Sequence, residues 1–226
     1  LRLLAAKALG DCKGDKAVHC LINIVETTTN RLELRLLAAK ALGDCKGDKA
    51  VAFLLNIANG TTGDDLYLRK VATHALGKCK GEQSVDCLIK ITNGATTNDL
   101  GLRARGAKAL GACKGGKVVA CLLNIANGTT TDDLYLRKVA THALGECGED
   151  EAVDCLINIA NTTNYSGLRM HAARALGECE GEKAVNCLLD IANGTKTEDL
   201  DLRIEAVWAL EKYREEQAVN CLIDIA

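Results

Sequence analysis

Cysteine is the residue type in this sequence with the clearest capacity for chemistry, because thiols bind zinc and form disulfides. Twelve cysteines occur among 226 residues, in two sets that recur along the chain. One set, expected in turns, is Cys12, Cys45, Cys79, Cys113, Cys147 and Cys179; the other, expected within helices, is Cys20, Cys87, Cys121, Cys155, Cys187 and Cys221. A spacing of eight residues between neighbours of the two sets is not a zinc-binding spacing, and four histidines are too few to complete such sites. We therefore predict no metal site.

Two interpretations of the cysteines stay open. Tyr213 and Phe53 occupy the positions where the two sets lack a cysteine, and aromatic replacement favours reduced thiols in apolar packing sites. The alternative is a disulfide ladder from each turn cysteine to the helical cysteine of the next repeat, which would require an oxidising compartment. Its bonds would be Cys45–Cys87, Cys79–Cys121, Cys113–Cys155, Cys147–Cys187 and Cys179–Cys221.

Several asparagines bear on the same question, because each begins a possible N-glycosylation sequon in an expected surface loop. They are Asn59, Asn127, Asn161, Asn164 and Asn193. An Asn-Gly pair at a helix end is equally explained as a helix stop. We favour a cytoplasmic location, and the sequons together with the cysteines leave an extracellular one as the alternative.

No residue set in the sequence is typical of an active site. His74 and His142 occupy equivalent repeat positions, but neither belongs to a recurring arrangement of carboxylate, histidine and nucleophile. The sequence also lacks a phosphate-binding loop, a dinucleotide-binding glycine motif and a metalloprotease His-Glu-x-x-His motif. We therefore predict no catalytic residue and no cofactor, and that the protein is not an enzyme.

Composition excludes further classes of function. The formal net charge is −2, so no basic excess indicates a nucleic-acid partner. No apolar run approaches the roughly 20 residues that span a bilayer. Proline is absent and aromatic residues make up 3%, which favours helices over strands. The core must consist of Ala, Leu, Ile, Val and Cys.

The dipeptide Leu-Arg recurs seven times at intervals of 32 to 34 residues, so the elements that position these residues are repeats. We divide the chain into repeats 1–33, 34–67, 68–101, 102–135, 136–167, 168–201 and 202–226, a single array that we interpret as part of a longer one.

Each repeat predicts two helices. The segment LRLLAAKALG at 1–10 has apolar residues at helical spacing, and we expect this first helix to close at Gly10 in the left-handed conformation. After a short turn, KAVHCLINIV at 16–25 has one broad apolar face and forms the second helix. Acidic residues such as Asp65 precede the next first helix, where they favour its positive end. One such hairpin cannot bury its apolar faces alone, so neighbours must stack.

The segments LRLLAAKALG…AVHCLI at 1–22 and LRMHAARALG…AVNCLL at 168–189 resemble the HEAT-like repeats of phycobilin lyases. The resemblance covers the whole chain. It implies an all-α fold, a right-handed α-solenoid of stacked two-helix repeats with an armadillo-like superhelix. It also implies that the arginine of each Leu-Arg pair forms a structural ladder with acids of neighbouring repeats.

The resemblance further implies that the second helices line a concave face, whose residues bind the partner. These residues are His19, Cys20, Asn23, Phe53, Asn56, Asp86, Lys90, Asn124, Asp154, Asn158, Asn186, Asp190, Asn220 and Asp224. The face would be mildly polar with a row of thiols, which suits a protein or peptide, or copies of the protein itself, more than a phosphate backbone.

We therefore predict a scaffold that binds a protein or peptide partner. One alternative is a secreted, disulfide-braced and glycosylated repeat protein that assembles into a fibre or surface layer. A third, implied by the resemblance alone, is an accessory subunit of a phycobilin-lyase-like enzyme. The last repeat, with IEAVWALEKYREE at 204–216, differs most from the others, as terminal repeats do.

Overall fold

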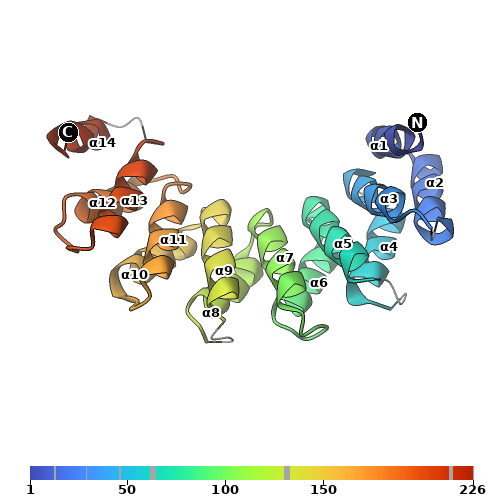
Figure 1. Ribbon diagram of the computed structural model, residues 1–226, viewed down its shortest axis with the longest axis horizontal. Helices are drawn as coiled ribbons and strands as arrows, with labels where there is room; N and C mark the ends of the chain where they lie inside the picture. Colours follow the sequence, from blue (N-terminus) through green and yellow to red (C-terminus); the bar gives the residue numbers. More distant parts are fainter. Residues whose placement is uncertain are drawn as a thin grey trace. The chain divides into compact units, whose positions relative to one another are not determined.

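The computed structural model describes residues 1–12, 14–28, 30–45, 47–61, 65–129, 133–213 and 216–225. Within these residues the chain forms fourteen α-helices and no strand (Figure 1). The first helices of the repeats are α1 (Arg2–Cys12), α3 (Leu32–Cys45), α5 (Leu66–Cys79), α7 (Leu100–Gly111), α9 (Leu134–Cys147), α11 (Ser166–Leu176) and α13 (Leu200–Leu210). The second helices are α2 (Asp15–Thr27), α4 (Asp48–Asn59), α6 (Glu82–Thr92), α8 (Gly116–Ala126), α10 (Asp150–Thr162), α12 (Glu182–Ala192) and α14 (Glu216–Ile225).

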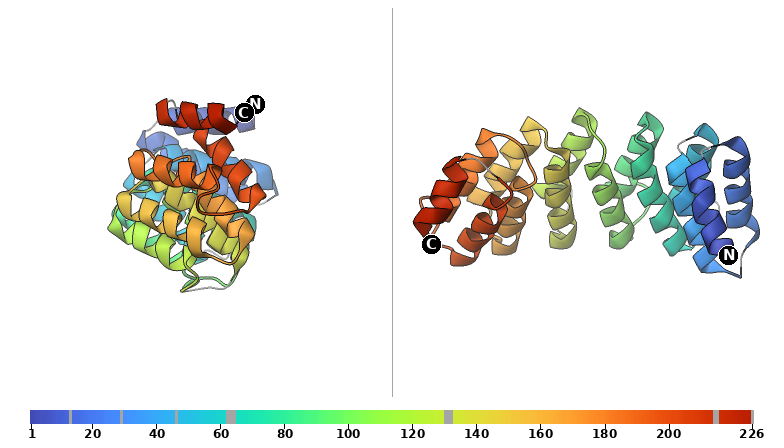
Figure 2. Two further views of the ribbon diagram at one scale, coloured as in Figure 1. Left: turned by 90° about the vertical axis from the view of Figure 1, so that its left-hand side faces the viewer. Right: turned by 90° about the horizontal axis from the view of Figure 1, so that it is seen from above.

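The helices are grouped in two compact units, Leu1–Cys113 and Lys114–Ala226, and the division falls between the two helices of the fourth repeat. In the first unit α1, α3, α5 and α7 stack in sequence, and α2, α4 and α6 each pack against the first helix of the next repeat. The second unit has the same arrangement, with α9, α11 and α13 stacked and α8, α10 and α12 each packed against the following first helix (Figure 2). This packing confirms the predicted all-α solenoid of two-helix repeats.

Glycine sets the spacing between stacked first helices. A Cβ on Gly43 would lie 2.8 Å from Ala75 Cβ and 2.9 Å from the Ala75 Cα and carbonyl oxygen, so only glycine permits this approach. The expectation that Gly10 closes its helix in the left-handed conformation is wrong, because Gly10 is buried inside α1, which continues to Cys12. Gly177 does cap α11, but with a right-handed φ of −65°. The Gly43–Ala75 contact recurs as Gly10–Ala41, Gly77–Ala109, Gly145–Ala175 and Gly177–Ala209.

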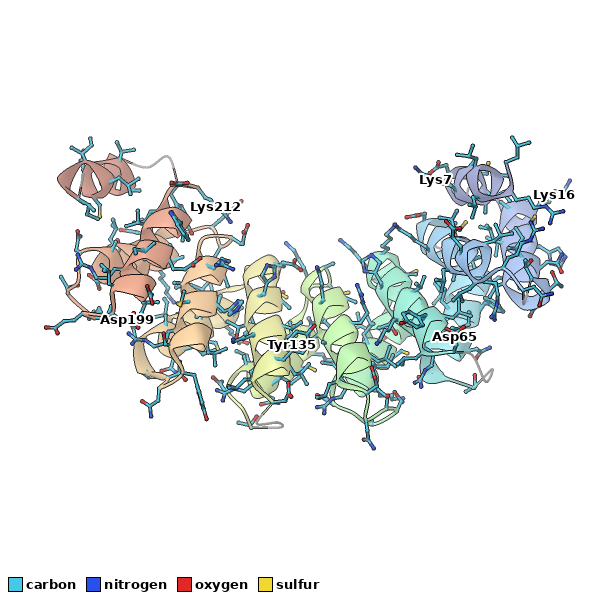
Figure 3. All side chains as sticks on the ribbon, viewed as in Figure 1. Lys7, Lys16, Asp65, Tyr135, Asp199 and Lys212 are labelled. Atoms are coloured by element: carbon cyan, nitrogen blue, oxygen red, sulfur yellow. The ribbon has the colours of Figure 1, made fainter. Side chains whose placement is uncertain are left out.

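Left-handed glycine follows helices of both kinds, as Gly148 does after the first helix α9 with φ of 63° and Gly60 does after the second helix α4. Gly60 caps α4 with φ of 73°, and its N–H donates to the Ile57 carbonyl, as expected for an Asn-Gly helix stop. Gly94, Gly128 and Gly194 adopt the same conformation. At the other end of the loop, Asp65 caps α5 by accepting a hydrogen bond from the Leu68 N–H at 2.8 Å. Figure 3 shows Asp65 and Asp199 at the starts of α5 and α13.

Candidate functional site

The second helix of each repeat packs against the first helix of the next repeat, and we call this contact the joint. The arginine of the Leu-Arg pair binds at the joint. Arg69 Nε and Nη2 both donate to the Ala58 carbonyl at 3.2 Å, and the guanidinium lies against Gly60. A cation at this place satisfies the negative C-terminal end of α4. The equivalent bonds, 2.8 to 3.1 Å long, are Arg35 to Val25, Arg103 to Thr92, Arg137 to Ala126, Arg169 to Ala160 and Arg203 to Ala192.

Acidic partners are secondary at these joints. Arg35 Nη1 lies 3.9 Å from the Asp65 carboxylate of the next repeat, and Arg169 Nη1 lies 3.8 Å from that of Asp199. The expected ladder is therefore present in a different form. Each arginine donates mainly to a backbone carbonyl of the preceding second helix, and the carboxylates lie farther away. The arginines serve the framework and are not arranged for catalysis.

The turn cysteines pack against the end of the preceding first helix. Cys45 Sγ lies 3.8 Å from the Gly10 carbonyl oxygen, and Cys79 Sγ lies 3.9 Å from that of Gly43. In the last repeat the hydroxyl of Tyr213 takes this position, 2.6 Å from the Leu176 carbonyl oxygen and within reach of that of Cys179. The position therefore accepts any side chain that fills the space and offers a weak donor to a carbonyl.

The helical cysteines are buried, except for Cys20 in the first repeat. Cys87 Sγ lies 3.4 Å from Asn59 Oδ1, and burial raises the pKa of this thiol to about 11. The contact recurs as Cys155–Asn127, Cys187–Asn161 and Cys221–Asn193. The row of exposed thiols expected on the second helices is thus wrong, because these sulfurs face the preceding repeat. As neutral buried groups they are poor nucleophiles.

All twelve cysteines lie in the described residues, and none forms a disulfide. The two sets contact different partners, as Cys45 and Cys87 do, so the alternative ladder is not formed. This applies to Cys45–Cys87, Cys79–Cys121, Cys113–Cys155, Cys147–Cys187 and Cys179–Cys221. Packing also accounts for four of the five sequon asparagines, since Asn59, Asn127, Asn161 and Asn193 receive the thiols. Glycosylation at these asparagines and at the exposed Asn164 gains no support.

The sequence holds a signal for this contact that we did not use. A helical cysteine follows each asparagine at or next to the end of a second helix, 28 residues on for Asn59 and Cys87. The second repeat carries Phe53 instead, and Glu26 stands where the preceding helix would supply the asparagine. The one repeat without the helical cysteine thus also lacks the asparagine that would meet it.

The predicted partner-binding residues lie on successive second helices, and we call them the second-helix stripe. Its exposed members are His19, Cys20, Asn23, Asn56, Lys90, Asn124, Asp154, Asn158, Asn186 and Asn220. Phe53, Asp86 and Asp190 are half-buried, and the side chain of Asp224 lies outside the described residues. Neighbouring helices meet here through the Lys183–Asp154 ion pair at 2.9 Å. The role of the stripe in binding stays a prediction.

Each unit exposes aromatic side chains on its first helices, which the sequence reasoning did not use. Tyr67, Tyr135 and Trp208 are all more than half exposed there, and Tyr135 lies on α9 in Figure 3.

The two units differ in charge. Residues 1–113 contain 17 Lys and Arg and 11 Asp and Glu, and residues 114–226 contain 11 Lys and Arg and 19 Asp and Glu. The net charge of −2 conceals this opposition, which a count over each half would have found.

The histidines form no catalytic set. His74 and His142 are half-buried, and His142 Nδ1 lies 3.6 Å from Glu146 Oε1. Burial, together with Arg105 and nearby lysines, lowers the pKa of His74.

Among the residues that the structure describes, no three His, Cys, Asp or Glu side chains are grouped to hold a metal ion. Over the same residues, no helix is long and apolar enough to cross a membrane.

Sequence comparison identifies the repeats. Residues 126–196 and 168–226 match the family described as HEAT repeats, and the earlier repeats have the same pattern. Residues 126–226 are therefore HEAT-like repeats, and the first unit has the same two-helix packing. No curated protein matches this chain.

Solved structures of similar fold have low sequence identity. The complex of CpcE and CpcF of phycocyanin lyase from Nostoc sp. PCC7120 is 22% identical, with a TM-score of 0.49 over 100% of this chain and 89% of that one. Human deoxyhypusine hydroxylase in complex with glycerol is 18% identical, with a TM-score of 0.48 over 95% and 80%. An engineered protein is 19% identical, with a TM-score of 0.45 over 86% and 95%.

Proposed function

We propose that this helical repeat scaffold is non-enzymatic and binds a protein or peptide partner on the second-helix stripe. The observation that supports the proposal is a division between two sets of residues. Polar groups that recur from repeat to repeat, such as Arg69 and Asn59, are used in contacts between repeats. The exposed side chains of the second helices vary in part: the position of Asn56 is Asn in four repeats, Lys90 in one and Asp in two, and His19 is replaced by Asn186 in a later repeat. The first set fixes the fold, and the second is available for recognition.

The chemistry of the stripe suits a polypeptide. It presents amides and single charges of both signs, such as Lys90 and Asp154, above a layer of buried leucines. Amides pair with the donors and acceptors of a peptide backbone, whereas a nucleic acid would require a basic excess. We therefore expect no nucleic-acid partner for this surface.

The proposal is tested by photo-crosslinking in the cells that make the protein. A benzophenone side chain is placed at Asn56, Asn124 or Asn158, and at the exposed Glu180 before α12 as the control. We expect one discrete adduct from the three stripe positions and none from Glu180. Equal adducts at Glu180, or none at the stripe, would contradict the proposal.

A further inference from the structure

The first helices of the first unit form a groove. Two adjoining hollows, of about 310 and 530 Å³, share Leu36, Lys40 and Val71 as lining residues. Leu3 and Leu37 extend the apolar lining toward α1, and Tyr67, Lys70, His74 and Arg105 line the larger hollow toward α7. We call this surface the first-helix groove. It has an apolar floor long enough for several side chains of a bound peptide.

The groove is positively charged. Lys40 and Arg105 have no carboxylate within ion-pair distance among the described residues, and Lys70 pairs with Asp99 at 3.6 Å. Glu33 is the acidic residue that lines the smaller hollow. The lowered pKa of His74 has Arg105 and Lys40 among its causes, which agrees with a positive potential inside the groove. These cations contribute to the excess of Lys and Arg in residues 1–113.

On the same surface of the second unit, an acid pairs with the cation that corresponds to Lys40. Arg174, at the repeat position of Lys40, makes two hydrogen bonds to the Glu205 carboxylate at 2.7 and 2.9 Å. His142, at the position of His74, lies beside Glu146. Lys212 pairs with Glu178 as its repeat equivalent Lys78 pairs with Asp44, so this pair is common to both units. The positive groove is therefore not a general product of the repeat pattern.

We propose that the first-helix groove binds an acidic peptide segment of a partner protein. Apolar side chains of the segment pack on Leu36 and Val71, and its carboxylates pair with Lys40 and Arg105. Charge complementarity selects the sign of the partner, and the apolar floor selects a polypeptide, since a phosphate backbone has no apolar side chain to place there. The groove lies apart from the second-helix stripe, so the two proposals stand or fall separately.

The test measures the fluorescence anisotropy of a short fluorescein-labelled peptide made of Glu and Leu, with the intact chain. We expect binding that weakens as salt is raised. The double variant Lys40→Glu/Arg105→Glu should weaken it roughly tenfold, as two charge reversals of modest individual effect combine. The matched control is Lys138→Glu, a charge reversal on α9 in the other unit, with little expected effect. Lys40→Ala/Arg105→Ala repeats the test if the reversed variant unfolds.

Four binding results would overturn the proposal. They are equal binding of a peptide with Lys in place of Glu, an equal loss in Lys138→Glu, unaltered binding in the folded alanine variant, and displacement of the peptide by a single-stranded oligonucleotide. Sedimentation tests whether a second copy of the chain occupies the groove instead. Self-association that rises with concentration and is abolished by Lys40→Glu/Arg105→Glu would assign the groove to the acidic half of a second copy and overturn the proposal. Stripe crosslinking is unaffected by these outcomes.

Discussion

The ion pair between α11 and α13 allows a sharp test of how this array handles buried charge. Glu205 is 3% exposed, and its carboxylate receives both hydrogen bonds from Arg174, whose side chain is 49% exposed. Removing one partner of a buried pair costs ~3–5 kcal/mol. Because water reaches the arginine, we discount this for Arg174→Ala to about 2 kcal/mol.

Replacement of the acid should have the opposite outcome. Other repeats carry Leu37 and Val71 at the position of Glu205, so the site accepts an apolar side chain. Glu205→Leu removes the buried charge and leaves Arg174 in contact with water, so we expect a change within about 1 kcal/mol of zero. In the double variant the penalty of Arg174→Ala should vanish, since no carboxylate is left unpaired.

The assay is urea unfolding followed by tryptophan fluorescence. Trp208 is the single tryptophan, it lies three residues after Glu205 on α13, and it therefore reports on the repeat that is perturbed. The midpoint should fall for Arg174→Ala and stay near wild type for Glu205→Leu. Equal losses in the two variants, or no loss in Arg174→Ala, would refute the reasoning.

Three further predictions concern packing and thiols. Gly43→Ala should cost about 1–2 kcal/mol, because overpacking against Ala75 backbone atoms outweighs the gain in helix propensity, whereas Gly116→Ala meets no atom within 4 Å and should not destabilise; equal urea midpoints would contradict this. A thiol reagent at neutral pH should label the exposed Cys12 and Cys20 quickly, the half-buried Cys79 less quickly and the nine buried cysteines slowly, as peptide mapping would show. Rapid labelling of the buried thiols would count against their packing. Burial raises the pKa of Cys121 to about 11, so the contribution of this neutral thiol to stability is full below pH 9 and is lost, by up to about 2.7 kcal/mol, as the pH rises toward 11. Cys87, Cys155, Cys179 and Cys187 have pKa values raised to about 11 as well and add to the fall. Cys121→Ala should remove only the share of Cys121 in urea titrations, and an unchanged fall would be the contrary result.

The fold was predictable because the repeat pattern reports directly on local structure. Apolar residues at helical spacing located both helices of each repeat. Gly60 marked the end of α4 and Asp65 the start of α5, because capping depends on the backbone of a few neighbouring residues. Gly10 was misassigned because its role is set by Ala41, a residue one repeat away. A glycine near a helix end has the same sequence signature for either role.

The candidate sites were less predictable, for a related reason. A disulfide ladder and the packing of reduced thiols would give the same recurrence of cysteines in the sequence. Which of the two forms depends on whether Cys87 contacts Cys45 or Asn59. The first-helix groove combines Lys40, Val71 and Arg105 from three helices, so no contiguous motif encodes it. Periodicity locates a surface, but the charge of that surface depends on which neighbours carry acids.

The arginine joint has a consequence for how such a gene can change. The donor and its acceptor are separated by only 11 residues in Arg69 and Ala58, so any duplicated or deleted segment of one repeat length carries an intact joint to its new neighbour. The contact also persists where the loop is two residues shorter, between Ala160 and Arg169. Unequal recombination within the array should therefore yield foldable products of different length, and a natural population is expected to contain alleles that differ by whole repeats.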